Sequence, residues 1–295
     1  MLIDTHAHLN FDAYKVDADD VIRRSLAQDI WIINVGSQYA TSKRAIEIAE
    51  KYEVGVYATI GLHPIHLETN LVKIKIDQEE VKFNSREEKF DYEKYKNLAF
   101  GKNLDFRSAQ IKELAQSKKV VAIGEIGLDY YYKPKTKRKL EIFKEKQKNT
   151  LLEQLALAKE LNLPVIFHCR MAHKDLIEFL KENQKIRPEK AVAHGFVGKL
   201  DELKEYLNFG YFVGFNGIIF KKIEGIDFEE NIKNTPLDKI LIETDCPYLT
   251  PPQIEGRNEP LNVKYIAKRL AEIKNVSYEE ITQITIKNAK KLFNI

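Results

Sequence analysis

The sequence predicts an α/β fold, a TIM (β/α)8 barrel that forms a single domain over residues 1–295, with an inserted segment after strand 3 at approximately residues 66–118. Short apolar runs of strand length occur eight times, and amphipathic stretches with apolar residues three and four apart lie between them. The length of 295 residues matches such a barrel with an insertion. Strands that alternate with helices indicate a parallel sheet with right-handed crossovers, and eight of them can close.

The expected strands leave room for a helix after each. They are Met1–Thr5, Ile30–Val35, Val54–Ile60, Val120–Gly124, Leu163–Phe167, Ala191–Ala193, Tyr211–Phe215 and Lys239–Thr244. The expected helices include Asp17–Gln28, Ser42–Tyr52, Lys139–Leu161, His173–Asn183 and Leu200–Phe209. In a barrel of this kind the carboxyl ends of the strands form the face that carries the active site.

Two segments are longer or more basic than an ordinary crossover requires. Pro64–Lys119 is rich in Lys, Glu, Asp, Tyr and Phe. It starts on the expected active-site face, so it is either a lid or specificity loop, or an extra surface helix or solvated segment. Tyr130–Asn149 holds eight basic residues against two acidic ones. Its first residues suit a phosphate-bearing substrate, whereas a solvated helix face explains the later lysines.

Composition excludes several classes of protein. Apolar residues make up 44% of the chain and charged residues 31%, which is typical of a globular protein and not of a disordered or membrane protein. No segment approaches the roughly 20 apolar residues of a membrane span, so we expect a cytoplasmic enzyme without membrane contact. The net charge of +3 does not favour non-specific coating of nucleic acid, and no obligate protein partner is evident. Cys169 and Cys246 are too few for a disulfide framework and are interpreted as buried packing residues.

Two histidines one residue apart end the first expected strand. Side chains in a strand alternate between its faces, so His6 and His8 point the same way and can bind one metal ion together. A pair of this kind is only moderate evidence for a metal site. The other strands must supply further ligands.

Imidazoles and carboxylates also follow most of the other strands, where chance would scatter them along the chain. They are His63, Glu125, His168, His194 and Asp245. If they point inward, they converge at the mouth of the barrel. Four histidines and two carboxylates, with His63 left aside, exceed the needs of one tetrahedral ion, so we expect two divalent ions, about 3.5 to 4 Å apart, with one carboxylate between them. Such a pair suits hydrolysis of a phosphodiester, in which Asp245 takes or steers the proton.

Seven ordered motifs carry a family resemblance that runs from end to end. They are Asp4 to His8, Gly61 to Pro64, Gly124 to Tyr131, His168 to Arg170, His194 to Phe196, Glu243 to Leu249 and Arg257 to Pro260. The chain resembles the TatD-related metal-dependent deoxyribonucleases, within the amidohydrolase-like superfamily of TIM-barrel enzymes. The long segment after strand 3 and the basic stretch after Tyr132 depart from the family pattern, which leaves substrate preference open.

The resemblance implies a set of ligands for two metal ions. A first ion is expected on His6, His8, Glu125 and Asp245, and a second on Glu125, His168 and His194, so that Glu125 bridges the two. We expect Asp245 and Glu125 to be the catalytic residues. The ions are Mg²⁺, Mn²⁺ or Zn²⁺.

Further residues near the strand ends are candidates for substrate binding, each with a structural alternative. His63 binds a phosphate or caps the following segment, and Arg170 holds a phosphate or braces its loop in an ion pair. Tyr130 to Tyr132 stack on a base, or at least two of the three pack against the barrel or the inserted segment. Arg257 contacts substrate or braces the last loop. Glu243 shares strand parity with Asp245, and we expect it to support a ligand histidine.

The sequence therefore favours a metal-dependent hydrolase that cleaves phosphodiester bonds of DNA with a two-metal activated water. It is expected to be exonuclease-like and to take single-stranded ends, because a recessed barrel mouth admits one strand more readily than a duplex. One alternative is a two-metal hydrolase of another ester, amide or small phosphoester substrate. A non-enzymatic alternative is a metal-stabilised binding protein.

Overall fold

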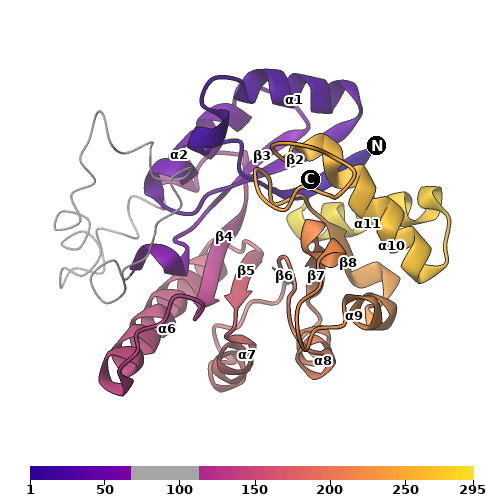
Figure 1. Cartoon of the computed structure of the whole chain (residues 1–295). Helices are drawn as coiled ribbons and strands as arrows, with labels where there is room; N and C mark the ends of the chain where they lie inside the picture. Colours follow the sequence, from indigo (N-terminus) through magenta and orange to yellow (C-terminus); the bar gives the residue numbers. More distant parts are fainter. Residues whose placement is uncertain (68–112) are drawn as a thin grey trace.

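Eight parallel strands form the centre of the molecule, and helices surround them (Figure 1). The computed structural model of the chain describes residues 1–67 and 113–295. Each strand pairs with the next in chain order, which confirms the predicted TIM barrel. The strands are β1 Leu2–Ala7, β2 Ile30–Val35, β3 Val56–Ile60, β4 Val120–Asp129, β5 Val165–Arg170, β6 Ala191–Ala193, β7 Phe212–Phe215 and β8 Ile240–Ile242.

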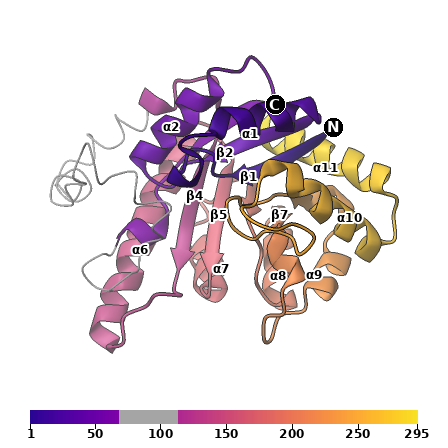
Figure 2. The same ribbon diagram turned by 45° about the horizontal axis from the view of Figure 1, so that its top comes forward.

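Helices cover the outside of the strands in both ribbon views (Figures 1 and 2). The α-helices are α1 Ala18–Ala27, α2 Tyr39–Ala49, α6 Lys137–Glu160, α7 His173–Glu182, α8 Leu200–Asn208, α9 Phe228–Asn234, α10 Val263–Lys274 and α11 Tyr278–Phe293. Short 3-10 helices are η1 Asp12–Tyr14, η2 Pro64–Leu67, η4 Gly217–Phe220, η5 Leu237–Lys239 and η6 Pro260–Asn262. The five helices that the sequence predicts are present, with ends shifted by a few residues. Most of the expected insertion, and with it the lid hypothesis, lies outside the described residues.

Strand β4 is five residues longer than the sequence predicts, because Gly124 does not end it. The strand continues to Asp129, and its pairing with β5 shifts register between Ile123 and Ile126. A second glycine, Gly127, also lies inside this strand. A Cβ atom there would lie 1.9 Å from the carbonyl oxygen of His168, so the glycine permits close approach of β5. Glu125 is therefore inside β4 and not just after it.

The barrel closes between β8 and β1 mainly through side chains. The Asp4 carboxylate accepts hydrogen bonds from the backbone N–H (2.8 Å) and the hydroxyl (2.6 Å) of Thr244. Beyond the end of β8, Asp245 donates its N–H to the carbonyl of His6 at 2.8 Å. This pairing brings the carboxylate of Asp245, from the segment after β8, next to the histidines at the end of β1.

Two apolar clusters fill the space inside and outside the strands. The smaller one joins alternate strand residues such as Ile3, Ile166 and Val192 to Leu292 and Phe293 at the end of α11. The larger one packs the helices against the outer faces of the strands.

Ile123 belongs to the larger, outer cluster, although it is two residues before Glu125 on the same strand. The register shift that follows it lets Glu125 reach the metal site in spite of that orientation.

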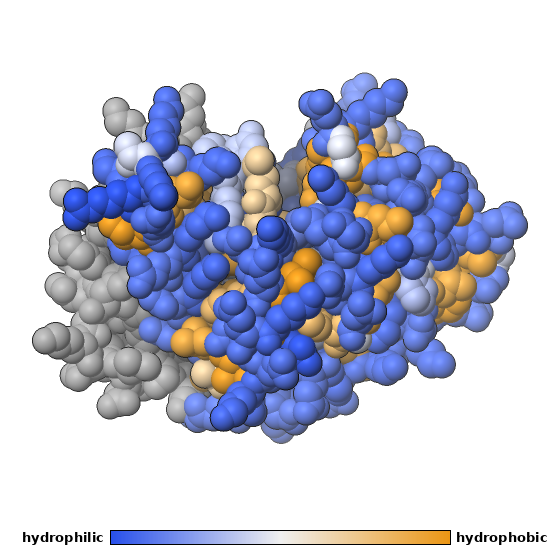
Figure 3. Space-filling model, turned by 90° about the horizontal axis from the view of Figure 1, so that it is seen from below, coloured by the Kyte–Doolittle hydropathy of each residue, from blue (hydrophilic) through white to orange (hydrophobic). Residues whose placement is uncertain are grey.

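The surface is largely polar on the face seen in Figure 3, where apolar residues form small separate patches. In the described part of the chain, no helix combines the length and the apolar character that a bilayer crossing requires.

Candidate metal centre

The six expected ligands meet at the carboxyl ends of the strands. His6, His8 and Glu125 are almost fully buried. Asp245 is the most exposed of the four residues expected to bind the first ion, with 18% of its side chain accessible. His168 and His194 complete the set from β5 and from the end of β6.

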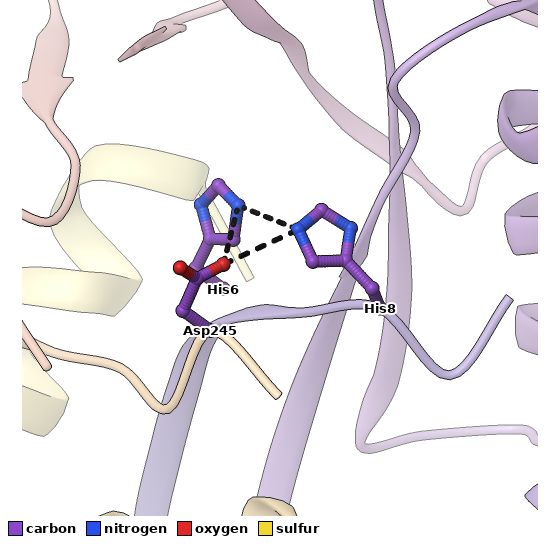
Figure 4. A group of neighbouring side chains, drawn as sticks. All are labelled: His6, His8 and Asp245. Atoms are coloured by element: carbon purple, nitrogen blue, oxygen red, sulfur yellow. Dashed lines mark hydrogen bonds and ion pairs between the residues drawn. The ribbon is translucent and has the colours of Figure 1, made fainter. Parts of the chain in front are cut away.

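The first ligand group joins β1 to the loop after β8. His6, His8 and Asp245 offer ligand atoms that all lie within 4.8 Å of one another (Figure 4). The Nε2 atoms of His6 and His8 are 3.2 Å apart, and Asp245 Oδ1 is 3.4 Å from His8 Nε2. Because His8 Nδ1 is 3.0 Å from the carbonyl of Val35 and must donate to it, a neutral His8 aims a lone pair at His6. A shared cation satisfies both nitrogens.

The second group of potential ligands gathers around Oε1 of Glu125. Its Oε1 atom lies 2.5 Å from His168 Nδ1 and 3.3 Å from His194 Nε2, whereas Oε2 faces His6 Nε2 at 3.4 Å. His63, Glu125 and His168 also form a compact group of potential ligands. The two oxygens of one carboxylate thus face two different sets of histidines.

Carboxylates behind the histidines orient their rings. His194 Nδ1 lies 2.9 Å from Glu243 Oε1, and His168 Nε2 lies 3.1 Å from Asp129 Oδ2. Each contact holds one ring nitrogen and leaves the other for the metal site. The supporting role expected for Glu243 matches this geometry. Asp129 was missed, although it shares strand parity with Glu125, because the sequence predicted that β4 ended at Gly124.

The charges of this cluster depend on one another. Burial alone lowers the pKa of a histidine, but Glu125 and Asp129 outweigh it and raise the pKa of His168 to about 9. The pKa of His194 is also raised, with Glu243 and Glu125 opposing burial. Burial raises the pKa of Glu125, but the neighbouring histidines bring it well below its usual value. The site thus attracts cations, and protons compete with metal for it.

His63 presents a proton to the site and not a lone pair. Its Nδ1 atom accepts the N–H of Ile65 at 3.0 Å, so the neutral ring carries its proton on Nε2. That atom is 3.6 Å from Glu125 Oε1. Burial and the neighbouring His168 lower the pKa of His63 to about 3, which keeps the ring neutral.

The other three candidates for substrate binding differ in what they contact. Tyr130 is buried and its hydroxyl donates to Asp175 at 3.1 Å. Arg257 donates to both carboxylate oxygens of Asp17, as the loop-bracing alternative describes. Arg170 is exposed, and its guanidinium carbon lies 3.6 Å from the ring centroid of Tyr131.

The two cysteines are free thiols beside the site. Cys246 is buried and Cys169 is partly buried. Burial raises the pKa of both thiols, that of Cys246 to about 12. Within residues 1–67 and 113–295, neither belongs to a group of potential metal ligands.

Known proteins share both the sequence and the architecture of this chain. The family model described as TatD related DNase matches residues 3–294. The chain is 38% identical to the metal-dependent hydrolase YabD of Bacillus subtilis over 100% of both chains, and 30% identical to the human deoxyribonuclease TATDN3 over 99% of this chain and 94% of that protein. The crystal structure of YjjV, a TatD homologue from Escherichia coli, superposes with a TM-score of 0.77 at 28% identity, covering 100% of this chain and 98% of that one. The chain therefore belongs to the TatD-related DNase family of metal-dependent hydrolases.

Proposed function

We propose that this hydrolase cleaves phosphodiester bonds of DNA with water activated between two divalent ions, and that it works on single-stranded ends. The observation that carries the proposal is the position of Glu125, whose two oxygens face separate groups of histidines. The human relative named a deoxyribonuclease supports the choice of DNA.

Each side chain has a separate task in this proposal. His6, His8, Glu125 and Asp245 hold a first ion, and Glu125, His168 and His194 hold a second. When bound, such a pair acidifies water and neutralises charge on the attacking and leaving oxygens. Asp245 takes the proton, because its carboxylate is more exposed than that of Glu125, with 18% against 6% of the side chain accessible.

Two further groups fit a phosphate. His63 holds its Nε2–H toward Glu125 Oε1, where it donates to an oxygen of the scissile phosphate. Arg170 lies two residues beyond His168 and supplies a cationic donor for a neighbouring phosphate of the same strand. Neither side chain needs to change its charge during the reaction.

The test begins with protein stripped of metal and reloaded with Mg²⁺, Mn²⁺ or Zn²⁺. We expect metal-dependent shortening of labelled single-stranded DNA, with slower cleavage of duplex DNA and RNA. Intact single-stranded substrate after hours with every ion contradicts the proposal. A phosphotriester, a lactone and a dipeptide in the same panel reveal the alternative, a hydrolase of another ester, amide or small phosphoester. Metal binding without any turnover favours a metal-stabilised binding protein.

Asp245→Asn tests the proton acceptor. We expect kcat to fall at least 100-fold, the lower range for loss of a general base. Because Asp245 also binds metal, metal content is measured on the same sample. Asp238→Asn is the matched control, since this exposed aspartate lies in η5, before β8 and at the opposite end of the strand. Unchanged turnover in Asp245→Asn removes this residue from the mechanism.

A further inference from the structure

We infer that the rim of the barrel carries a nucleotide subsite in which Tyr131 and Tyr132 stack on a base of single-stranded DNA while Arg170 binds the adjoining phosphate. This inference rests on the proposed function and specifies how its substrate is held. The three residues lie in the loop after β4 and at the end of β5.

The aromatic run after β4 is divided between packing and exposure. Tyr130 is 4% exposed and its hydroxyl is bonded to Asp175. Tyr131 and Tyr132 are 47% and 37% exposed, and their ring centroids are 4.7 Å apart in an edge-to-face arrangement. The buried ring anchors the loop, so the two neighbouring rings are held in place while a large part of each stays accessible. Exposed aromatic rings of this kind are the usual platform for unpaired bases.

The cation beside these rings is available for a phosphate. The guanidinium of Arg170 lies over the ring of Tyr131, with its carbon 3.6 Å from the centroid. Among residues 1–67 and 113–295, no carboxylate forms an ion pair with this guanidinium. A guanidinium stacked by its face keeps its N–H edge free for phosphate oxygens. Exposed Lys133 and Lys135 follow in the same loop, and no acidic residue occurs between Tyr130 and Leu140.

Hydrogen bonds connect the loop that carries the two rings, and the backbone of Arg170, to the candidate metal centre. Tyr131 donates its N–H to Asp129 Oδ1 at 2.8 Å, and the other oxygen of Asp129 contacts the ligand His168. Tyr130 donates its N–H to the carbonyl of Arg170 at 2.9 Å. Arg170 is two strand residues beyond His168, a step of about 7 Å. A phosphate on Arg170 is therefore close to one held by the metal centre.

Three variants separate the parts of this subsite. Tyr131→Phe keeps the ring, Tyr131→Leu keeps only apolar bulk, and Arg170→Gln removes the charge. Tyr57→Leu is the matched control, because Tyr57 also lies near a cation, Lys119 Nζ at 5.6 Å, but near the amino end of β3. Each protein is loaded with metal and tested on a single-stranded oligonucleotide and on copies that carry one abasic position.

Stacking and charge predict different signatures. In Tyr131→Leu we expect the dissociation constant and KM for the intact oligonucleotide to rise about fivefold or more, the lower range for loss of one stacked base. In wild type and in Tyr131→Phe, one abasic position causes a loss of similar size, which Tyr131→Leu no longer shows. Arg170→Gln weakens intact and abasic strands alike and lowers the salt dependence of log Kd by about one unit of slope.

The outcomes distinguish the subsite from the proposed function. Suppose that wild type cleaves DNA but Tyr131→Leu binds DNA as tightly as Tyr57→Leu does; the subsite is then overturned and the nuclease activity stands. The same conclusion follows if Tyr131→Leu loses affinity but remains as sensitive to an abasic position as wild type. If wild type binds single strands in a Tyr131-dependent way but cuts none, only the proposed nuclease activity is overturned. Protein that neither binds nor cleaves single strands overturns both.

Discussion

Single carboxylate side chains fix the orientation of two histidine rings in this molecule. The rings of His168 and His194 each have one nitrogen against a carboxylate that is not itself among the six proposed ligands. Glu243 also accepts N–H groups from Gly195 and Asn216, so its carboxylate is held from several sides. A ring that is fixed before the metal arrives loses less entropy on binding it.

Glu243→Gln tests this orientation directly. The variant keeps the volume but removes the charge behind His194, so we expect metal affinity to fall about 10- to 100-fold. Calorimetric titration of stripped protein with Mn²⁺ measures it. Glu182→Gln, at the exposed end of α7, provides the control. Equal affinities in the two variants contradict a positioning role for Glu243.

His173 makes the stability of the fold depend on pH. Its Nδ1 is 3.0 Å from the Tyr206 hydroxyl and its Nε2 is 3.1 Å from the carbonyl of Val197, and burial lowers its pKa to about 4. The folded state therefore favours the neutral ring. This contribution is complete above the unfolded pKa of about 6.5 and is lost as the pH falls toward 4.

The corresponding experiment compares wild type with His173→Gln by urea unfolding at pH 7 and pH 5. Wild type should lose about 2 kcal/mol more than the variant between these pH values, because only wild type gains a proton at this position on unfolding. The comparison cancels the other histidines, which both proteins share. Parallel pH profiles rule out His173 as the titrating group.

At the scale of elements, the loop after β8 is fastened to the start of the chain. Arg257 is bonded to Asp17, next to α1, and also reaches Glu259, which in turn pairs with Arg24 of α1 at 2.6 Å. The hydroxyl of Tyr14 donates to the carbonyl of Asn258 in the same loop. This network holds the segment that follows Asp245 in place.

Arg257→Gln distinguishes bracing from substrate contact. We expect the free energy of unfolding to fall by about 1 to 2 kcal/mol, since charged hydrogen bonds in a partly buried network are lost. Arg24→Gln breaks the same network from the other side and serves as the comparison. If Arg257 only braces the loop, both variants change KM for DNA to a similar extent. A rise in KM confined to Arg257→Gln indicates contact with substrate.

At the scale of the whole molecule, the metal centre joins strands from both ends of the chain. The histidines of β1 meet Asp245 beyond β8, and Glu125 connects them to β5 and β6. Ions that bind only the folded arrangement stabilise it by mass action, by about 2.7 kcal/mol at a free concentration 100 times Kd. We therefore expect removal of metal to weaken barrel closure as well as catalysis.

Thermal unfolding with EDTA and with added Mn²⁺ measures this coupling. We expect the midpoint to rise by several degrees with metal, because each kcal/mol corresponds to about 2 to 4 °C in a chain of this size class. His8→Asn should lose most of that rise, whereas exposed Glu182→Gln should retain it. An identical midpoint with and without metal in wild type excludes stabilisation by the ions.

The barrel and the residue types of the candidate ligands could be predicted from the sequence, because apolar periodicity, strand parity and the placement of histidines at strand ends are local properties. The sequence also indicated that the segment between the third and fourth strands is too long for an ordinary crossover. Local patterns failed where pairing with another strand decided the outcome. The strand was predicted to end at Gly124, yet pairing with β5 continues β4 to Asp129, whose carboxylate lies behind His168.

The neighbours of each side chain could not be predicted from the sequence, because they depend on the three-dimensional fold. Tyr130 and Arg257 have residue types that suit a substrate, but Asp175 and Asp17 lie close enough to bind them. Tyr131 stands next to Tyr130 in the sequence and is nevertheless exposed beside Arg170. The physical reason is that hydrogen bonds and burial act between residues far apart in the chain, and their distances are set by the closed barrel and not by spacing along the sequence.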